Sequence, residues 1–197
     1  MNNQISKESK LETGYKYGFV TDIESEQIPK GINTSTVELI SSIKKEPKWI
    51  TDFRLKGYRS WVRQEHPEWH HLNIPEIDFQ DIVYYSAPKG SDEVKTLDDL
   101  PQEILETYEK LGIPLEEVKQ LEGIAVDAVF DSVSVGQAVN EALDKAGVIF
   151  CPISEAIEKY PKLVKKYLGS VVPANDNYYA ALNTAVFSDG SFVYVPK

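Results

Sequence analysis

The sequence predicts an α+β fold, with a mainly helical region followed by strands near the C-terminus. Apolar residues recur every three or four positions from Asn33 to Pro47 and again after Pro47, which is the period of an amphipathic helix. Residues 124–131 change to a period of two, which is typical of a strand. A short apolar run at 192–195 predicts a further strand near the end of the chain.

The composition is that of a folded soluble protein. Its 197 residues are enough for one core with a smaller appendage. Apolar residues make up 42% and charged residues 26%, so the chain has a core to bury. The net charge of -10 disfavours nucleic acid or an anionic membrane as a partner, because phosphate contacts need clustered Lys and Arg. No apolar run approaches the roughly 20 residues that span a bilayer.

Cysteine usage and the start of the chain predict a cytoplasmic protein. Cys151 is the single cysteine, so it has no partner for an internal disulfide and cannot supply the several thiolates of a structural zinc or iron-sulfur site. The first residues contain neither the apolar stretch of a signal peptide nor the Arg-rich character of a transit peptide.

The helical region is predicted to follow a loose arm over residues 1–32. Asn33 is placed to cap a first helix, with Val37 and Ile40 on its apolar face. Pro47 interrupts this helix and suits the first turn of a second one. The buried face of the second helix is expected to contain Ile50, Phe53, Gly57 and Trp61.

The middle of the chain is predicted to be a loop followed by acidic helices. Three prolines make residues 66–96 the most irregular part of the sequence. Between 91 and 122, ten acidic residues stand against three lysines, which accounts for seven of the ten net negative charges. Within this acidic stretch one helix is expected to end at Gly112 and another to start at Pro114.

The C-terminal half is predicted to alternate strands and helices. The strand at 124–131 is followed by a helix over 135–146, by composition, and by a strand at 148–151. Ser154 is placed to cap the next helix, and Pro161 opens another that ends at Gly169. Near the end, an Asp-Gly pair at 189–190 between the apolar runs 178–187 and 192–195 predicts a β-hairpin.

Three histidines, His66, His70 and His71, are the first candidates for a chemical site, since imidazoles with nearby carboxylates can ligate a metal. Their spacing suits zinc only on a continuous helix, and Pro67 predicts a break there. We therefore expect a polar helix end packed around Trp69 and no metal site.

Other candidates also have structural explanations. Cys151 is expected to be a buried structural thiol, because the sequence displays no base that would activate it. Asp127 and Asp131 share one side of the predicted strand and suit acid/base chemistry, but solvated or capping roles are favoured. The tyrosine pairs at 84–85 and 178–179 are expected in the core or at an interface. The residues alone predict no catalytic, cofactor-binding or metal-binding side chain.

A series of strings, in order and spanning nearly the whole chain, resembles the N-terminal part of SufB, in the SufB/SufD family of iron-sulfur cluster assembly scaffolds. They include KGIN, YYSAP, AVDAVFDSVSV and AALN, and no single one of them is a catalytic signature. The strings occupy residues 30–33, 49–54, 58–61, 84–88, 125–135, 167–169, 172–177, 180–183 and 188–197.

This resemblance implies a particular fold. Family members are more than twice as long, so it implies a mainly helical N-terminal domain over 33–169 and, over 170–197, the first strands of a truncated right-handed parallel β-helix. The important cysteines of the family, with the His and Glu that help to hold the nascent cluster, would lie beyond Lys197. Some relatives have a CxxCxxxC motif after the Ser-Ala-Pro string, whereas residues 89–93 here contain no cysteine.

The resemblance also implies a scaffold rather than an enzyme. It implies a truncated SufB-like chain that acts with the SufC ATPase and SufD, with sulfur from a SufE-like or SufU-like donor. No cofactor is expected in this part of the protein. Two alternatives stay open: a stand-alone module whose acidic helices bind a basic partner, and a cytosolic enzyme that uses Cys151 with a histidine.

Overall fold

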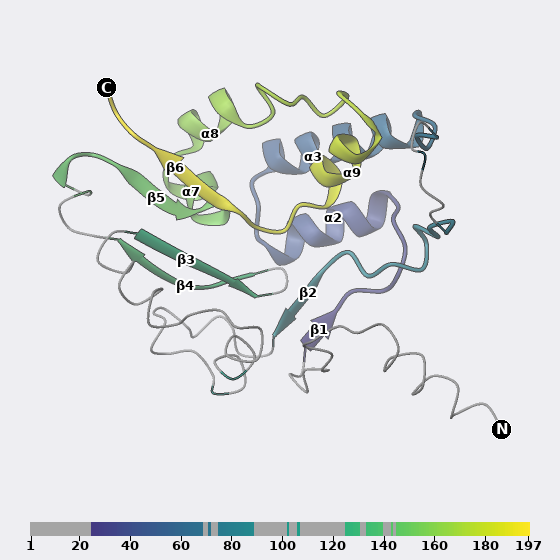
Figure 1. Cartoon of the computed structure of the whole chain (residues 1–197), viewed down its shortest axis with the longest axis horizontal. Helices are drawn as coiled ribbons and strands as arrows, with labels where there is room; N and C mark the ends of the chain where they lie inside the picture. The colour runs from purple at the N-terminus through teal and green to yellow at the C-terminus, as the bar shows by residue number, and fades with distance from the viewer. Residues whose placement is uncertain are drawn as a thin grey trace.

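The fold consists of helices and small two-stranded sheets (Figure 1). The computed structural model describes residues 25–68, 71, 75–88, 102, 106, 125–130, 133–139, 143 and 145–197, with the segments 125–130 and 133–139 described by their backbone only. The helices are α2 (Thr34–Ile43), α3 (Lys48–Val62), α7 (Ile153–Lys159), α8 (Pro161–Tyr167) and α9 (Tyr178–Val186). The strands are β1 (Ser25–Gln27), β2 (Ser86–Pro88), β3 (Ala125–Phe130), β4 (Val133–Val139), β5 (Ile149–Pro152) and β6 (Ser191–Tyr194).

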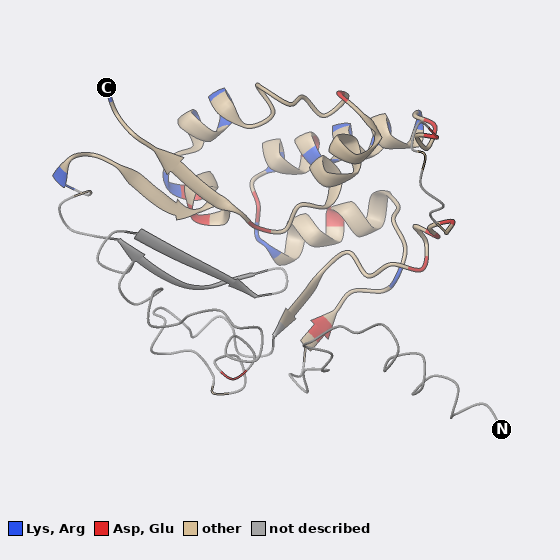
Figure 2. Cartoon of the chain, in the orientation of Figure 1, with Lys and Arg blue, Asp and Glu red and all other residues tan. Residues whose placement is uncertain are grey.

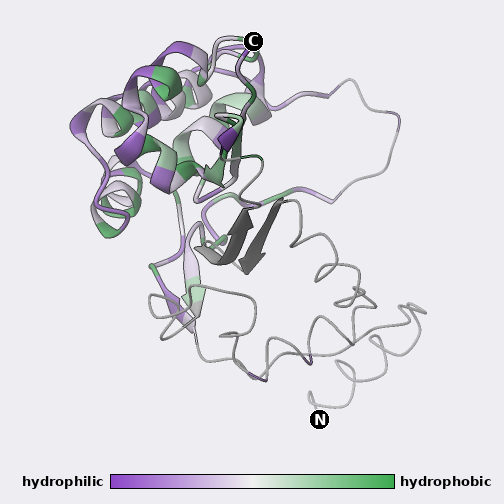
Figure 3. Ribbon diagram, turned by 90° about the vertical axis from the view of Figure 1, so that its left-hand side faces the viewer, coloured by the Kyte–Doolittle hydropathy of each residue, from purple (hydrophilic) through white to green (hydrophobic). Residues whose placement is uncertain are grey.

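Helices α2 and α3 form where the sequence predicts them. The Asn33 side chain accepts a hydrogen bond from the Thr36 N–H at 3.0 Å, so the predicted cap is confirmed. On α3, Ile50 and Trp61 are buried as expected, whereas Phe53 is only half-buried. Arg54 is fully buried on this face, a position that the sequence analysis did not assign to the core. Figure 3 shows that the helical ribbons carry both hydrophobic and hydrophilic residues, which is typical of amphipathic helices.

Helix α9 packs closely against α3. A Cβ built at Gly57 would lie 2.8 Å from the Thr184 Cβ, so the two backbones approach as near as a glycine allows. One hydrophobic cluster forms around this crossing and contains Ile32, Val37, Trp61, Tyr178, Ala181 and Ala185.

The predicted hairpin around residues 189–190 is wrong, because the apolar run before it is a helix. The Asn177 side chain caps α9 by accepting a hydrogen bond from the Ala180 N–H at 2.9 Å. The helix then contains several alanines and a leucine, which are strong helix formers. Strand β6 pairs with β5 instead, in an antiparallel register.

The prediction of a helix over 135–146 is also wrong for its first half. Strands β3 and β4 pair as an antiparallel hairpin with an irregularity between Ala128 and Val129. The β-branched residues Val133, Val135 and Val139 favour a strand, and pairing with β3 supplies the backbone hydrogen bonds that a helix would otherwise make. The predicted strand at 124–131 is confirmed as β3.

All strands in the described part of the chain pair in twos and antiparallel, and they form no parallel β-helix. The resemblance implies β-helix strands over 170–197, whereas in the structure this range contains the helix α9 and the short strand β6. Helix α8 begins at Pro161 and ends shortly before Gly169, as predicted. Gly169 has a φ angle of +68°. The acidic helices predicted between 91 and 122 lie outside the described residues, apart from positions 102 and 106.

The arm is not loose over residues 25–32. Strand β1 pairs with β2, and the Gly31 N–H donates to the Ile82 carbonyl at 2.9 Å. Ile28 and Ile32 are buried, and the Ile32 N–H donates to the Gln80 side chain. The remainder of the predicted arm, residues 1–24, lies outside the described residues.

Candidate functional site

The strongest polar feature of the fold is a buried arginine on α3. Arg54 is 0% exposed and makes two hydrogen bonds to the Glu46 carboxylate, each at 2.6 Å. Its Nη1 also donates to the Phe187 carbonyl at 2.6 Å, and its guanidinium lies 3.9 Å from the centre of the Phe187 ring. This arginine therefore joins α3, the segment before it, and the end of α9.

A second buried pair lies at the approach to β6. The Lys44 Nζ is 3.5 Å from the Asp189 Oδ2, and their side chains are 7% and 4% exposed. The Ser154 hydroxyl donates to the same carboxylate at 3.2 Å, and the Gly190 N–H donates to it at 2.9 Å. Asp189 thus links α2, α7 and β6, and Ser154 makes this contact rather than the predicted cap of α7, whose N-cap position is Pro152.

We call Lys44, Glu46, Arg54 and Asp189 the buried ion-pair network. Each charge in it is close to an opposite charge, which offsets the desolvation of the buried groups. Sequence reasoning missed this network, although signals for it were present. Lys44 falls on the predicted apolar face of α2, and Arg54 follows the buried Ile50 by four residues.

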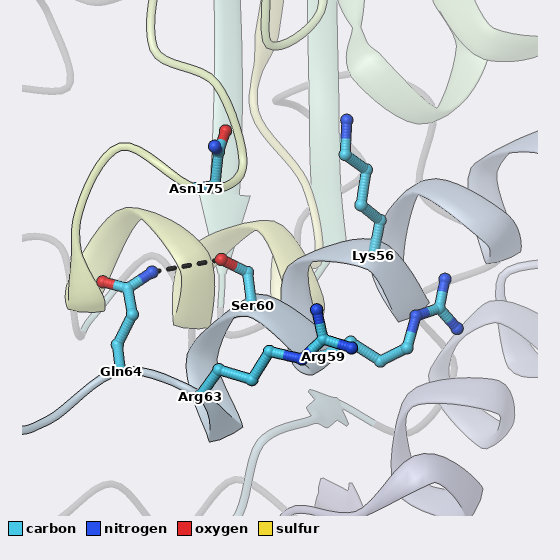
Figure 4. A pocket seen from close by; sticks show the side chains of 6 residues that line it. All are labelled: Lys56, Arg59, Ser60, Arg63, Gln64 and Asn175. Carbon is cyan, nitrogen blue, oxygen red and sulfur yellow. Dashed lines mark hydrogen bonds between the residues drawn. The ribbon is translucent and has the colours of Figure 1, made fainter.

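A basic pocket lies on another side of α3. Its volume is about 400 Å³. Side chains from α3, the two residues after it and the loop before α9 line it: Lys56, Arg59, Ser60, Arg63, Gln64 and Asn175 (Figure 4). Figure 2 shows basic residues on α3 and α8. Such a pocket is suited to binding anionic groups, because guanidinium and ammonium groups donate charge-assisted hydrogen bonds.

Among the described residues, His66 contacts aromatic side chains. The His66 Nε2 is 2.9 Å from the Tyr179 hydroxyl, and the His66 ring contacts the rings of Phe79 and Tyr178. His71 is exposed, and both His70 and Trp69 lie outside the described residues. Within the described ranges no three His, Cys, Asp or Glu side chains are grouped so as to hold a metal ion.

Cys151 is buried, as the sequence predicts. Its side chain lies in β5, is 2% exposed, and belongs to a hydrophobic cluster with Ile50, Ala156, Ile157 and Val164. Of the paired carboxylates, Asp127 lies in β3 and Asp131 lies outside the described residues.

The tyrosine pairs each have a buried member. Tyr85 and Tyr178 are buried, in line with the predicted core role, whereas Tyr179 is 45% exposed. The Tyr84 hydroxyl donates to the Phe79 carbonyl at 2.8 Å. Burial, with smaller contributions from Tyr178 and Asp78, raises the pKa of Tyr84 to about 12. Burial likewise raises the pKa of Tyr178.

The described part of the chain is thus an α+β fold with two buried ion pairs and a basic pocket on α3. No helix in the described part of the chain combines the length and apolarity that crossing a membrane requires.

Comparison with known proteins identifies the family. The model of the SufBD protein N-terminal region matches residues 115–197. The iron-sulfur cluster assembly SufBD family protein ycf24 of Pyropia yezoensis is 56% identical over 98% of this chain and 41% of its own length. The family protein slr0074 of Synechocystis is 57% identical over 93% of this chain and 38% of its own length. The chloroplastic family protein ABCI8 of Arabidopsis thaliana is 54% identical over 95% of this chain and 34% of its own length.

The chain therefore belongs to the SufBD family of iron-sulfur cluster assembly proteins. It spans between 34% and 41% of the length of these three relatives, of which it matches the N-terminal portion.

Proposed function

We propose that this chain supplies the N-terminal part of a SufB-type scaffold on which iron-sulfur clusters are assembled, and that it is not itself an enzyme. The observation behind this proposal is the 56% identity to a SufBD relative over 98% of the chain. The resemblance of the strings in the sequence favours SufB over SufD. The cluster is the cargo of such a scaffold, and the work of this region would be to hold the fold together and to bind partners.

The proposed partners are the SufC ATPase, SufD and a SufE-like or SufU-like sulfur donor. They follow from the resemblance, and the basic pocket on α3 offers one surface for contacts with another protein. We propose a cytoplasmic location; the relative ABCI8 is chloroplastic.

We further propose that β6 leads into the β-helix that the resemblance implies. Val193 and Val195 are exposed and stand at alternate positions, so they share one face of an extended segment. Further strands of a longer chain would cover this apolar face. The division into an arm (1–32), a helical domain (33–169) and a β-helix start (170–197) is part of the same proposal.

Chimeras test the proposal and separate SufB from SufD. This chain would replace the matching N-terminal part of a SufB-type relative and, separately, of a SufD-type relative. We expect the SufB-type chimera to purify with SufC and SufD and to take up iron and acid-labile sulfide during anaerobic reconstitution. The 197-residue chain alone, together with its Cys151→Ser variant as control, should retain neither iron nor sulfide after desalting.

The outcomes are distinct. Assembly by the SufD-type chimera alone would reassign the chain to SufD. Failure of both chimeras to bind SufC, although circular dichroism shows that both are folded, would contradict a scaffold role. Stoichiometric iron and sulfide on the chain alone, lost in Cys151→Ser, would place a cluster site within these 197 residues and refute the proposal.

A further inference from the structure

Three basic side chains line the pocket together without an ion-pair partner in the described part of the chain. Lys56, Arg59 and Arg63 are exposed and follow one side of α3 at helical spacing. Among the described residues, none of the three has a carboxylate oxygen within 4.0 Å. Five other cations each form such a pair: Lys30, Lys44, Lys48, Arg54 and Lys159. In a chain of net charge -10, this site keeps its positive charge without a carboxylate to pair with it.

Neutral polar groups complete the pocket. The Gln64 side chain donates to the Ser60 hydroxyl at 3.1 Å, which fixes the last turn of one wall. Asn175 comes from the loop before α9 and lies across the pocket from α3 (Figure 4). An amide, a hydroxyl and a second amide can each donate to and accept from a peptide backbone. The pocket can therefore form hydrogen bonds with a peptide backbone as well as bind a negatively charged group.

The loop that contributes Asn175 to the pocket also carries an exposed apolar segment. The loop between α8 and α9 runs along α3, since Gly169 lies against the Phe53 ring and Asn175 lies opposite Ser60. Val171 and Val172 lie between these two contact points and are 90% and 56% exposed. The loop that supplies Asn175 to the pocket thus also carries two exposed valines, so the pocket and this loop together offer a charged part and an apolar part.

We propose that this surface binds an acidic segment of a partner protein in which apolar residues stand next to carboxylates. The arginine forks would hold carboxylates through paired hydrogen bonds, and the two valines would cover the apolar residues. Inorganic phosphate or another small anion would use the cations but leave the valines exposed. The combination of both parts therefore favours a peptide as the occupant. This proposal does not depend on the Suf assignment, because it rests on the pocket and the loop between α8 and α9.

A defined peptide tests the proposal on the 197-residue chain. The probe is fluorescein-labelled Glu-Asp-Leu-Leu-Glu-Asp, with an all-glutamate peptide of equal length as comparison, and binding is followed by fluorescence anisotropy. Replacing all three cations, Lys56→Gln, Arg59→Gln and Arg63→Gln, should weaken binding of both peptides about tenfold or more. The matched control, Lys45→Gln, Lys48→Gln and Lys162→Gln, removes the same charge elsewhere and should change binding by less than about twofold.

The apolar part has its own test. The double variant Val171→Ser and Val172→Ser should weaken binding of the leucine-containing peptide several-fold and leave the all-glutamate peptide unchanged, because only the former has groups for the valines to cover. Circular dichroism should show that this double variant is folded, since both valine side chains are exposed.

Three results would overturn the proposal. Equal losses in the pocket and control triple variants would mean that the effect is one of net charge only. Displacement of the leucine-containing peptide by millimolar phosphate would identify a small-anion site. Peptide binding that appears only when Glu103, Glu106, Glu109, Glu116 and Glu117 are changed to Gln would assign the surface to the acidic stretch of the chain itself.

Discussion

Helix α3 carries basic side chains of two kinds, and the contrast between them separates stability from binding. Arg54 is buried, pairs with Glu46 and donates to two backbone carbonyls. Arg59 lies further along the same helix and Arg63 is its C-cap residue; both are exposed and have no carboxylate partner among the described residues. The same residue type on the same helix thus serves two purposes, and burial decides which one.

The difference follows from desolvation. A guanidinium that has lost its water must recover equivalent interactions inside the protein. Arg54 does so by donating hydrogen bonds to the Glu46 carboxylate and the Phe187 carbonyl. An exposed guanidinium keeps its water and can exchange it for a ligand at little cost to the fold. Substitutions should therefore affect stability at Arg54 and binding at Arg59 and Arg63.

The largest effect is expected for Arg54→Met. This change leaves the Glu46 carboxylate, which is 3% exposed, buried without its partner, and it frees the Phe187 carbonyl. We expect a loss of about 3 to 5 kcal/mol in the free energy of unfolding, measured by urea denaturation.

The double variant Arg54→Met and Glu46→Leu serves as the control for Arg54. Removing both charges should restore part of the loss, because no unpaired carboxylate remains. A double variant as unstable as the single one would attribute the role of Arg54 to its carbonyl contacts alone.

A smaller loss is expected for Asp189→Asn. An asparagine removes the charge that pairs with Lys44 but retains an oxygen for the Gly190 N–H and the Ser154 hydroxyl. We expect destabilisation of about 1 to 3 kcal/mol in thermal or urea unfolding. The matched exposed variant Asp52→Asn, whose pair with Lys48 lies in solvent, should change stability by less than about 0.5 kcal/mol. Equal effects would refute the contrast between buried and exposed pairs.

The sequence predicts α2, α3, α8 and β3 correctly because each has a local signal. Asn33 and Pro161 mark helix starts by their chemistry, and these signals need no knowledge of distant residues. The predictions for 135–139 and 178–186 are wrong for the opposite reason. Strand β4 depends on pairing with β3, and α9 depends on its crossing with α3, which places Thr184 against Gly57.

The candidate site was harder to predict than the fold. Asp189 lies 145 residues after Lys44, and Asn175 lies more than a hundred residues after Ser60, so no spacing rule connects either pair. A charged residue such as Arg54 is expected on the surface unless a partner is known, and that partner can be recognised only once the chain has folded. Family membership, by contrast, is spread over many local strings and is therefore visible in the sequence.

The pH dependence of unfolding should show the effect of burial on Tyr84. The pKa of Tyr84 is raised to about 12 in the folded state, mainly by burial, above the usual value of 10 in an unfolded chain. The folded state therefore holds this proton more tightly, so the associated stability is complete below pH 10 and is lost as the pH rises toward 12. Tyr84→Phe should reduce the fall in stability over that range, and an unchanged profile would contradict this assignment. In an absorbance titration at alkaline pH, the Tyr84→Phe variant should have one tyrosine fewer among those that ionise above the usual pKa of tyrosine.

The smallest effect is expected when the three pocket cations are replaced together by Lys56→Gln, Arg59→Gln and Arg63→Gln. Basic residues near the end of a helix interact favourably with the helix dipole, by about 0.3 to 1 kcal/mol each at most, and this contribution is lost. Like charges three and four residues apart repel one another by similar amounts, and that repulsion is also removed. Because the two effects oppose each other and neither involves a buried group, urea denaturation should show a net change below about 0.5 kcal/mol. A loss comparable to that of Arg54→Met would mean that these cations belong to the folded core, and the division of α3 into a stabilising side and a binding side would have to be abandoned.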